Sequence, residues 1–218
     1  MPNPANTLNL IQHHPAEGPG AITDWARRRG VALKVFRADL GQLPTVSSEP
    51  AIVLGGPYEA NAGPAWLETE RQWLAASVQQ GAPVFAICLG AQLLALSLGG
   101  KVRRMAHPET GWTSVIFADG TLLSVLEWHE DAIDLPPAAQ LLASSEGCEQ
   151  QMYRVSPHRV GVQFHPEWNA ESVTLLNQHF ADESPLLRDQ DDSAAHAAVF
   201  DWLRGTLDEW WTVSTETA

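Results

Sequence analysis

Cys88 stands in the sequence context of a cysteine nucleophile. The apolar run Pro83–Ile87 before it has the length and composition of a buried strand, and after Gly90 leucines recur at helical spacing until Gly99-Gly100. A sharp turn from strand to helix exposes the side chain at the turn, and the positive end of the following helix favours a thiolate. The alternative is a buried core cysteine, because free cysteines are among the most buried residues.

A cysteine nucleophile needs a base, and the base needs a group that orients it. His165 and Glu167 are candidates for these two roles. The segment Val160–Phe164 has the pattern of a strand, and Pro166 ends it. His165 is therefore expected at a strand end, where functional groups of an open α/β sheet gather, with the Glu167 carboxylate close enough to hold its tautomer. The alternative is a histidine with a structural role in the core or at the surface.

Gly55-Gly56-Pro57 follows a short apolar strand, and its backbone carries no side chain that would block a ligand. The N–H groups of Gly56 and Leu89 could therefore stabilise a developing oxyanion. The alternative is an ordinary turn between strand and loop.

The pattern of apolar residues predicts an α/β fold with a mostly parallel, open twisted sheet, helices on both faces and a small additional antiparallel sheet. We expect a single domain over residues 1–218. The predicted strands span 7–13, 31–36, 51–54, 83–87, 101–105, 113–118, 122–127, 139–144, 151–155 and 159–164. Helices are predicted over 21–29, 64–80, after Gly90, over 171–180 and over 194–211, with a loop over 182–193 and a frayed end from Thr212.

The composition is that of a globular protein with a net charge of −13. Such a charge argues against nucleic acid or an anionic membrane as a partner. No apolar run is long enough to cross a membrane, and the first residues do not have the pattern of a signal peptide. The two cysteines are too few for a disulfide framework, so we expect reduced thiols and a cytoplasmic location.

Three motifs occur in the order Leu-Gly-Gly-Pro (54–57), Ile-Cys-Leu-Gly-Ala-Gln (87–92) and Val-Gln-Phe-His-Pro-Glu (162–167). Together they resemble the class I glutamine amidotransferases, whose architecture is flavodoxin-like, and in particular the stand-alone branch similar to GMP synthase. The opening Ile11–Gly20, Pro108–Trp112 and Trp128–Asp131 resemble that branch as well.

The resemblance implies that Cys88 attacks the side-chain amide of glutamine and that His165, oriented by Glu167, transfers protons. It also implies oxyanion donors at Gly56 and Leu89, and substrate contacts from Gly55 and Gln92. No cofactor is implied. Ala86 departs from the glycine that the family usually has two residues before the nucleophile, and we expect a slightly tighter turn there.

Two further stretches, Glu109–Trp112 and Trp128–Asp131, are candidates for substrate binding, by Glu109 facing an ammonium group or by His129 and Asp131 at the rim. The alternative is a structural salt bridge and an aromatic core plug. A metal site of His129, Glu130 and Asp131 is disfavoured, because sequence neighbours converge poorly on one ion. Cys148 has no motif around it and is expected to be a buried apolar residue. The tryptophans are expected in the core, although Trp202, Trp210 and Trp211 could instead cover a partner interface.

The first functional hypothesis is an enzyme that cleaves the γ-amide of glutamine and supplies ammonia to a separate synthase, since no phosphate loop of the Walker type occurs in the chain. The second is a γ-glutamyl peptide hydrolase that acts without a synthase. The third is a catalytically quiet, partner-binding subunit, which the presence of Cys88, His165 and Glu167 disfavours. A weaker alternative is a related group of cysteine peptidases and chaperones, which lack the His-Pro-Glu motif. A homodimer is left open.

Overall fold

The computed structural model describes residues 6–181 and 193–216 of the chain. Its strands are β1 (Thr7–Gln12), β2 (Ala32–Arg37), β3 (Ala51–Val53), β4 (Val84–Ile87), β5 (Lys101–Phe117), β6 (Leu122–Asp134), β7 (Gln140–Ser144), β8 (Met152–Ser156) and β9 (Arg159–Val162). Its helices are α1 (Ala21–Arg29), α2 (Ala65–Gln79), α3 (Leu89–Ser97), α4 (Ala170–His179) and α5 (Ser193–Glu216), and a short 3₁₀ helix spans Ala38–Leu40.

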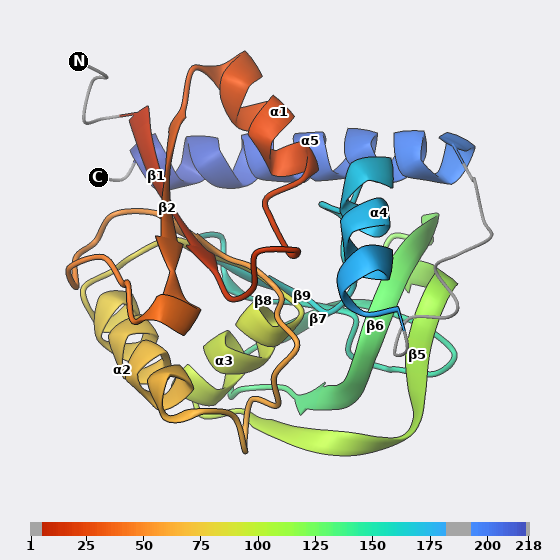
Figure 1. Ribbon diagram of the computed structural model, residues 1–218, viewed down its shortest axis with the longest axis horizontal. Coiled ribbons are helices and arrows are strands. Elements are labelled where there is room, and N and C mark those ends of the chain that lie inside the picture. Colours follow the sequence, from red (N-terminus) through yellow and green to blue (C-terminus); the bar gives the residue numbers. More distant parts are fainter. Residues whose placement is uncertain (1–5, 182–192, 217–218) are drawn as a thin grey trace.

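The nine strands of the described residues form one sheet in the order β2-β1-β3-β4-β9-β8-β7-β5-β6. Figure 1 shows β1 and β2 on one side of the molecule and the β5–β6 hairpin on the other. The half from β2 to β9 is parallel, and the half from β9 to β6 is antiparallel. The predicted α/β class, with a parallel core and an antiparallel part, is therefore confirmed. The antiparallel strands continue the parallel sheet, because β8 pairs with β9.

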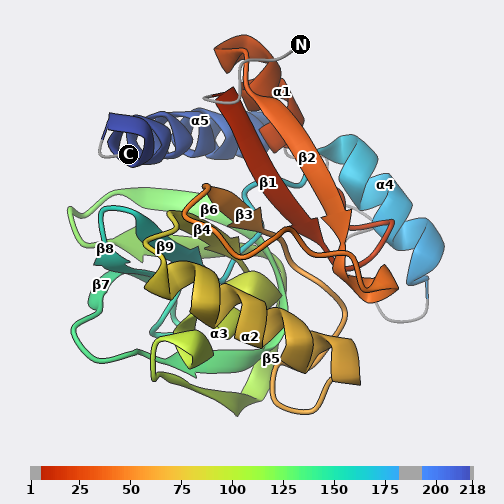
Figure 2. The ribbon, with the colours of Figure 1, turned by 90° about the vertical axis from the view of Figure 1, so that its left-hand side faces the viewer.

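Helices cover both faces of the parallel half. Figure 2 shows α1 and α5 on one side of the sheet and α2 and α3 on the other. The alternation of side chains along β4 explains this, since Phe85 and Ile87 join the cluster on the α5 side while Val84 and Ala86 join the cluster on the α2 side. A fully buried aliphatic or aromatic side chain contributes about 1.5–3 kcal/mol, so a strand that is buried on both faces anchors the sheet.

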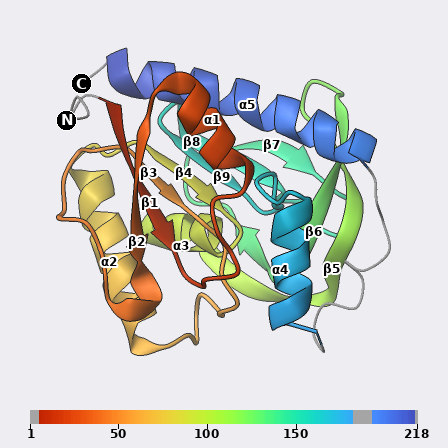
Figure 3. The same cartoon turned by 45° about the horizontal axis from the view of Figure 1, so that its top comes forward.

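Helix α5 crosses the sheet from the side of β1 to the β5–β6 hairpin (Figure 3). Its buried Trp210 contacts Phe85, and Trp211 contacts Trp25 of α1. Trp202 packs against Phe164. Trp210 and Trp211 therefore belong to the core, as predicted, and Trp202 is partly buried against it.

The sequence predictions differ from the structure in three places. The strands predicted over 101–105 and 113–118 are one continuous strand, β5, and β6 extends past residue 127 to Asp134. Helix α5 also continues beyond residue 211 to Glu216, so the frayed end predicted from Thr212 was wrong as far as the structure describes it. The predicted loop over 182–193 lies outside the described residues except for Ser193, which begins α5. None of the described helices is long and apolar enough to cross a bilayer.

Candidate active site

Cys88 lies between β4 and α3, where the chain reverses from strand into helix. Its backbone has φ 49° and ψ −111°, a conformation that a residue with a side chain adopts at a cost of about 1–3 kcal/mol. The turn requires Gly90, because a Cβ on that residue would stand 2.3 Å from the carbonyl oxygen of Val53. The strained turn directs the Cys88 side chain into a cavity at the carboxyl end of the parallel strands.

His165 follows β9, the strand that pairs with β4. Its Nδ1 lies 2.9 Å from Oε1 of Glu167, so Nδ1–H donates to that carboxylate and Nε2 is left for the nucleophile side. The indole of Trp168 stacks on the imidazole, with ring centroids 3.5 Å apart and planes inclined by 11°. Both partners and the histidine are almost fully buried, so the imidazole has one fixed orientation.

The electrostatics of this site favour a charged imidazole. Burial lowers the pKa of His165, but the Glu167 carboxylate and the Cys88 side chain, which also hydrogen-bonds with His165, outweigh it and raise the pKa to about 10. An imidazolium beside a thiolate is the general arrangement of activated cysteine nucleophiles.

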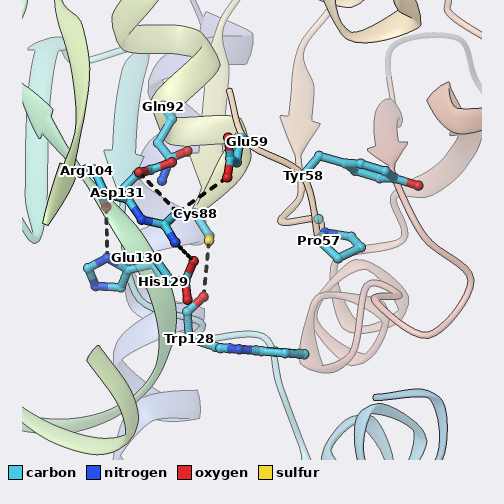
Figure 4. Close-up of a pocket in the computed structure, with 11 residues that line it drawn as sticks. Pro57, Tyr58, Glu59, Cys88, Gln92, Arg104, Trp128, His129, Glu130 and Asp131 are labelled. Atoms are coloured by element: carbon cyan, nitrogen blue, oxygen red, sulfur yellow. Dashed lines mark hydrogen bonds and ion pairs between the residues drawn. The ribbon is translucent and has the colours of Figure 1, made fainter. Parts of the chain in front are cut away.

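The cavity beside Cys88 has a volume of about 530 Å³. Arg104 pairs in it with Glu59, Glu130 and Asp131, and the Cys88 thiol lies 3.9 Å from the carbonyl oxygen of Trp128 (Figure 4). The lining residues come from the loop before α2, the start of α3, β5 and β6: Gly56, Pro57, Tyr58, Glu59, Cys88, Gln92, Arg104, Trp128, His129, Glu130 and Asp131. The cavity therefore offers both charge signs to a zwitterionic ligand.

Gly55 and Gly56 approach this site closely. A Cβ on Gly55 would stand 2.6 Å from Cε1 of His165, and one on Gly56 would stand 2.6 Å from Cβ of His13. In the part of the chain that the structure describes, neither the Gly56 N–H nor the Leu89 N–H donates to a protein acceptor. Gly56 lines the cavity beside Cys88, whereas Leu89 is buried directly after Cys88 and does not line it.

A second buried group of similar residues lies on β5 and β6. Glu109 stands opposite His129 in the antiparallel register, and Nε2 of His129 lies 3.1 Å from Glu109 and 3.2 Å from Glu127. The other ring nitrogen lies 2.9 Å from the carbonyl oxygen of Asp131. Burial lowers the pKa of His129, but the two carboxylates outweigh it and raise the pKa well above its usual value.

Cys148 lies beside this second group, and candidate ligand atoms of Glu109, His129 and Cys148 lie within 4.8 Å of one another. The side chains of Ser145 and Gln151 already donate to the Glu109 carboxylate, at 2.6 and 2.8 Å. Burial raises the pKa of the Cys148 thiol. These contacts favour a structural network over a metal site.

Comparisons with known proteins identify the family. Residues 20–181 match the family model "Glutamine amidotransferase class-I". The chain belongs to the class I glutamine amidotransferases. This match covers about three quarters of the sequence, including the segments that carry Cys88, His165 and Glu167.

Relatives of this amidotransferase differ in how much of the chain they match. The glutamine amidotransferase-like protein YfeJ of Salmonella typhimurium is 29% identical over 195 residues, which cover 81% of this chain and 82% of the relative. Gamma-glutamyl peptidase 3 of Arabidopsis thaliana is 26% identical, with 69% and 72% covered. The glutamine-hydrolysing GMP synthase subunit of Saccharolobus solfataricus is 43% identical over 95 residues, which cover only 39% of this chain and 50% of the relative.

Solved amidotransferases share the fold over almost the full length. A glutamine amidotransferase from Methylobacillus flagellatus superposes with a TM-score of 0.84 at 26% identity and covers 94% of each chain. One from Thermotoga maritima has a TM-score of 0.81 at 26% identity, with 98% of this chain and all of that chain covered. The predicted family architecture is therefore confirmed.

The structure places the predicted substrate residues of the amidotransferase in two groups. Gln92 and His129 line the cavity, and Nε2 of Gln92 lies 3.5 Å from Oε1 of Gln163. Gly55 and Glu109 do not line the cavity, and Glu109 pairs with His129. The alternative interpretation of Glu109 and His129 as a salt bridge therefore matches the observed contact.

Sequence reasoning missed several residues of the site. Arg104 lies in the predicted strand 101–105, to which the sequence assigned no function, and Trp168 was not connected with His165. Glu17 lies in the loop after β1 and is buried. A Cβ added to Gly55 would stand 3.1 Å from Oε2 of Glu17 and 2.6 Å from Cε1 of His165, so Glu17 lies beside His165. Burial raises the pKa of Glu17 to about 7, although His165 and His13 act against this. Its place in the opening motif was the only available signal.

Proposed function

We propose that this amidotransferase hydrolyses the γ-amide bond of glutamine or of a related γ-glutamyl compound, with Cys88 as nucleophile, His165 as general acid and base, and Glu167 as the group that orients His165. The observation that carries the proposal is the strained turn at Cys88, which holds the thiol in the cavity and in contact with a buried histidine–carboxylate pair. The family match supports the same reaction class.

The reaction would proceed in two halves. The Cys88 thiolate attacks the amide carbon, and the resulting oxyanion accepts hydrogen bonds from the N–H groups of Gly56 and Leu89. His165 then donates its proton to the leaving amine, the C–N bond breaks and a γ-glutamyl thioester remains. In the second half His165 takes a proton from water, the hydroxide attacks the thioester, and glutamate leaves while the thiolate is restored.

Cys88 is a better candidate nucleophile than Cys148 on physical grounds. Cys148 does not line the cavity, and its raised pKa keeps it a neutral thiol. The histidine near it, His129, is held by two carboxylates and a backbone carbonyl, so neither ring nitrogen is free to take a proton from a thiol.

The cavity favours a second candidate substrate class, the γ-glutamyl peptides. Its volume of about 530 Å³ is in the ~300–1,000 Å³ range of sites for drug-sized ligands, which is more than glutamine needs. One relative is named a gamma-glutamyl peptidase, and others are named as subunits of GMP synthase. With glutamine as substrate, we propose that the ammonia passes to a separate synthase chain and that residues 1–218 act as a single domain.

The test is glutamate release by the purified chain from glutamine and from a panel of γ-glutamyl dipeptides, with Cys88→Ala as the blank. Release that depends on Cys88 is the expected result. Faster release from a dipeptide identifies a hydrolase that acts alone, and release from glutamine alone identifies an ammonia-supplying enzyme. Equal release by Cys88→Ala would contradict the assignment.

A further inference from the structure

A third buried histidine–carboxylate pair lies behind the Gly55-Gly56 segment. His13 directly follows β1, and Glu70 lies on α2, 57 residues away. Nε2 of His13 lies 2.9 and 3.0 Å from the two carboxylate oxygens of Glu70, and Nδ1 lies 2.8 Å from the carbonyl oxygen of Gly55. Both side chains are fully buried.

Both ring nitrogens of His13 face acceptors, so both act as donors when the ring is protonated. Burial lowers the pKa of His13, but Glu70 and the Gly55 carbonyl outweigh it and raise the pKa. The Nδ1–H group therefore donates to Gly55 while the Nε2–H group donates to Glu70. A buried charge pair of this kind has a single favourable geometry, because breaking it leaves an unpaired charge in the core.

The hydrogen bond to Gly55 fixes the direction of the next N–H group. The peptide bond between Gly55 and Gly56 is trans, and in a trans peptide the C=O and the N–H point in opposite directions. Since the carbonyl points at His13, the Gly56 N–H points away from it, and Gly56 lines the cavity beside Cys88. Turning the peptide over would bring the Gly56 N–H toward the Nδ1–H group and set two donors against each other.

We propose that His13 and Glu70 form a positioning pair that holds the Gly55-Gly56 peptide with its N–H group directed at the oxyanion of the reaction. The inference rests on the proposed function. It adds that the oxyanion site is preorganised by residues of this chain alone, so no partner is needed to orient it. His13 itself does not touch the reacting atoms.

Packing around the pair supports a fixed peptide. Gly56 leaves no room for movement toward His13, since a Cβ there would stand 2.6 Å from Cβ of His13 and 3.0 Å from Cδ2 of Leu89. On its other side the His13 ring stacks on Trp66, with centroids 6.0 Å apart and planes inclined by 18°. The imidazole therefore cannot follow a rotating peptide.

The test compares two substitutions of similar size. His13→Leu removes the donor to Gly55, whereas His13→Asn places an amide N–H close to the position of Nδ1. A lost oxyanion donor lowers kcat by about 10²–10³-fold, so we expect that loss for His13→Leu with a KM change of no more than about threefold. For His13→Asn we expect kcat within about tenfold of the parent chain. His14→Leu is the matched control, because the His14 ring contacts the Ala16 N–H, His179 and Phe180, and we expect its kcat to be unchanged.

A second readout separates positioning from general damage. Alkylation of Cys88 by iodoacetamide is a direct displacement that forms no oxyanion, so its rate should be the same in the parent chain, His13→Leu and His13→Asn. Equal losses in alkylation and hydrolysis, or an unchanged kcat in His13→Leu, would overturn the inference. If His13→Leu does not fold, His13→Met provides the same comparison, because it also removes the donor to Gly55. If the parent chain shows no hydrolysis that depends on Cys88, the proposed function fails, and the inference with it.

Discussion

Two buried groups in this molecule contain a histidine, a glutamate and a cysteine, and they differ in almost everything except composition. His165 and Glu167 follow the end of β9 and lie beside Cys88, which lines the cavity. His129 and Glu109 face each other across two antiparallel strands, with Cys148 beside them.

The two groups differ in how the nitrogens of their imidazole rings are bound. The imidazole of His165 uses one nitrogen for Glu167 and has the other for Cys88. The imidazole of His129 is bound at both nitrogens, and its partner Glu109 also accepts from Ser145 and Gln151. An imidazole with both nitrogens engaged stabilises a fold, whereas an imidazole with one nitrogen beside a cysteine can take part in a reaction. Residue types alone would not separate the two.

The two cysteines give the largest expected contrast. Cys88→Ala should lower hydrolysis by more than about 10³-fold, because no other group can form the thioester. Cys148→Ala should change kcat by less than about threefold, since its thiol is neutral and outside the cavity. The measurement is kcat on the preferred γ-glutamyl substrate, with circular dichroism as a check of folding. A loss in Cys148→Ala that equals the loss in Cys88→Ala would reverse the assignment.

The two members of the His165–Glu167 pair should differ from each other. His165→Ala removes the proton carrier and should lower kcat by about 10²–10⁴-fold. Glu167→Gln keeps a hydrogen-bond acceptor for Nδ1 and should cost less, roughly 10–100-fold. Steady-state rates of the two variants at saturating substrate test this order. Glu167 would not be the orienting group if its variant lost as much as His165→Ala.

Removing Glu109 from the group with His129 and Cys148 should lower the free energy of unfolding more than it lowers kcat. Glu109→Ala leaves the imidazolium of His129 with one carboxylate fewer. Because Glu127 still faces this ring, we expect a loss of about 1–3 kcal/mol of unfolding free energy. Urea denaturation measures the loss. The kcat of the folded variant should remain within about tenfold of the parent chain, and a catalytic role for Glu109 would appear as a larger loss at unchanged stability.

The smallest contrast concerns the pH dependence of stability. Glu17 and Glu109 are expected to affect it in opposite directions. Burial raises the pKa of Glu17 from 4.5 to about 7, so the folded state holds this proton more tightly than the unfolded state. Its contribution is fully present below about pH 4.5 and is lost as the pH rises through about 7. Glu17→Gln mimics the protonated form and should therefore be more stable than the parent chain at pH 8, by up to about 3 kcal/mol.

Glu109 is the matched control for this pH experiment. Burial raises its pKa, but hydrogen bonds from His129 and Ser145 outweigh that and lower it, so its contribution is present at neutral pH and is lost on acidification. Glu109→Gln should accordingly be less stable than the parent chain at pH 8. The comparison fails if urea midpoints at pH 5 and pH 8 shift in the same direction for both variants.

Local patterns predicted the parts of the fold that local interactions determine. Helix α1 and the strand-to-helix turn at Cys88 were predicted within a few residues. At Cys88 a continuous apolar run gives way to leucines at helical spacing. The break predicted between residues 105 and 113 does not exist. Pairing with β6 carries the chain through this stretch, with a shift in register between Arg104 and Glu109. The helix end predicted at Trp211 was also wrong, since the hydroxyls of Thr212 and Thr215 bond to carbonyls of the preceding turn.

Contacts between distant segments could not be predicted in the same way. His165 and Glu167 are two residues apart, so their pairing was within reach of the sequence. The partners Arg104 and Glu59, or His13 and Glu70, lie on different elements, and only the folded sheet brings them together. The roles of Glu109 and His129 remained open for that reason, and the observed contact between them decides where Glu109 lies.

The most direct test of the account is to find which cysteine carries the γ-glutamyl group during turnover. The chain is mixed with the preferred substrate, quenched in acid, digested and analysed by mass spectrometry, with Cys148→Ala treated in parallel. The account predicts one γ-glutamyl group on the peptide that contains Cys88, in both proteins. A γ-glutamyl group on Cys148, or rapid hydrolysis without any group on Cys88, would contradict it.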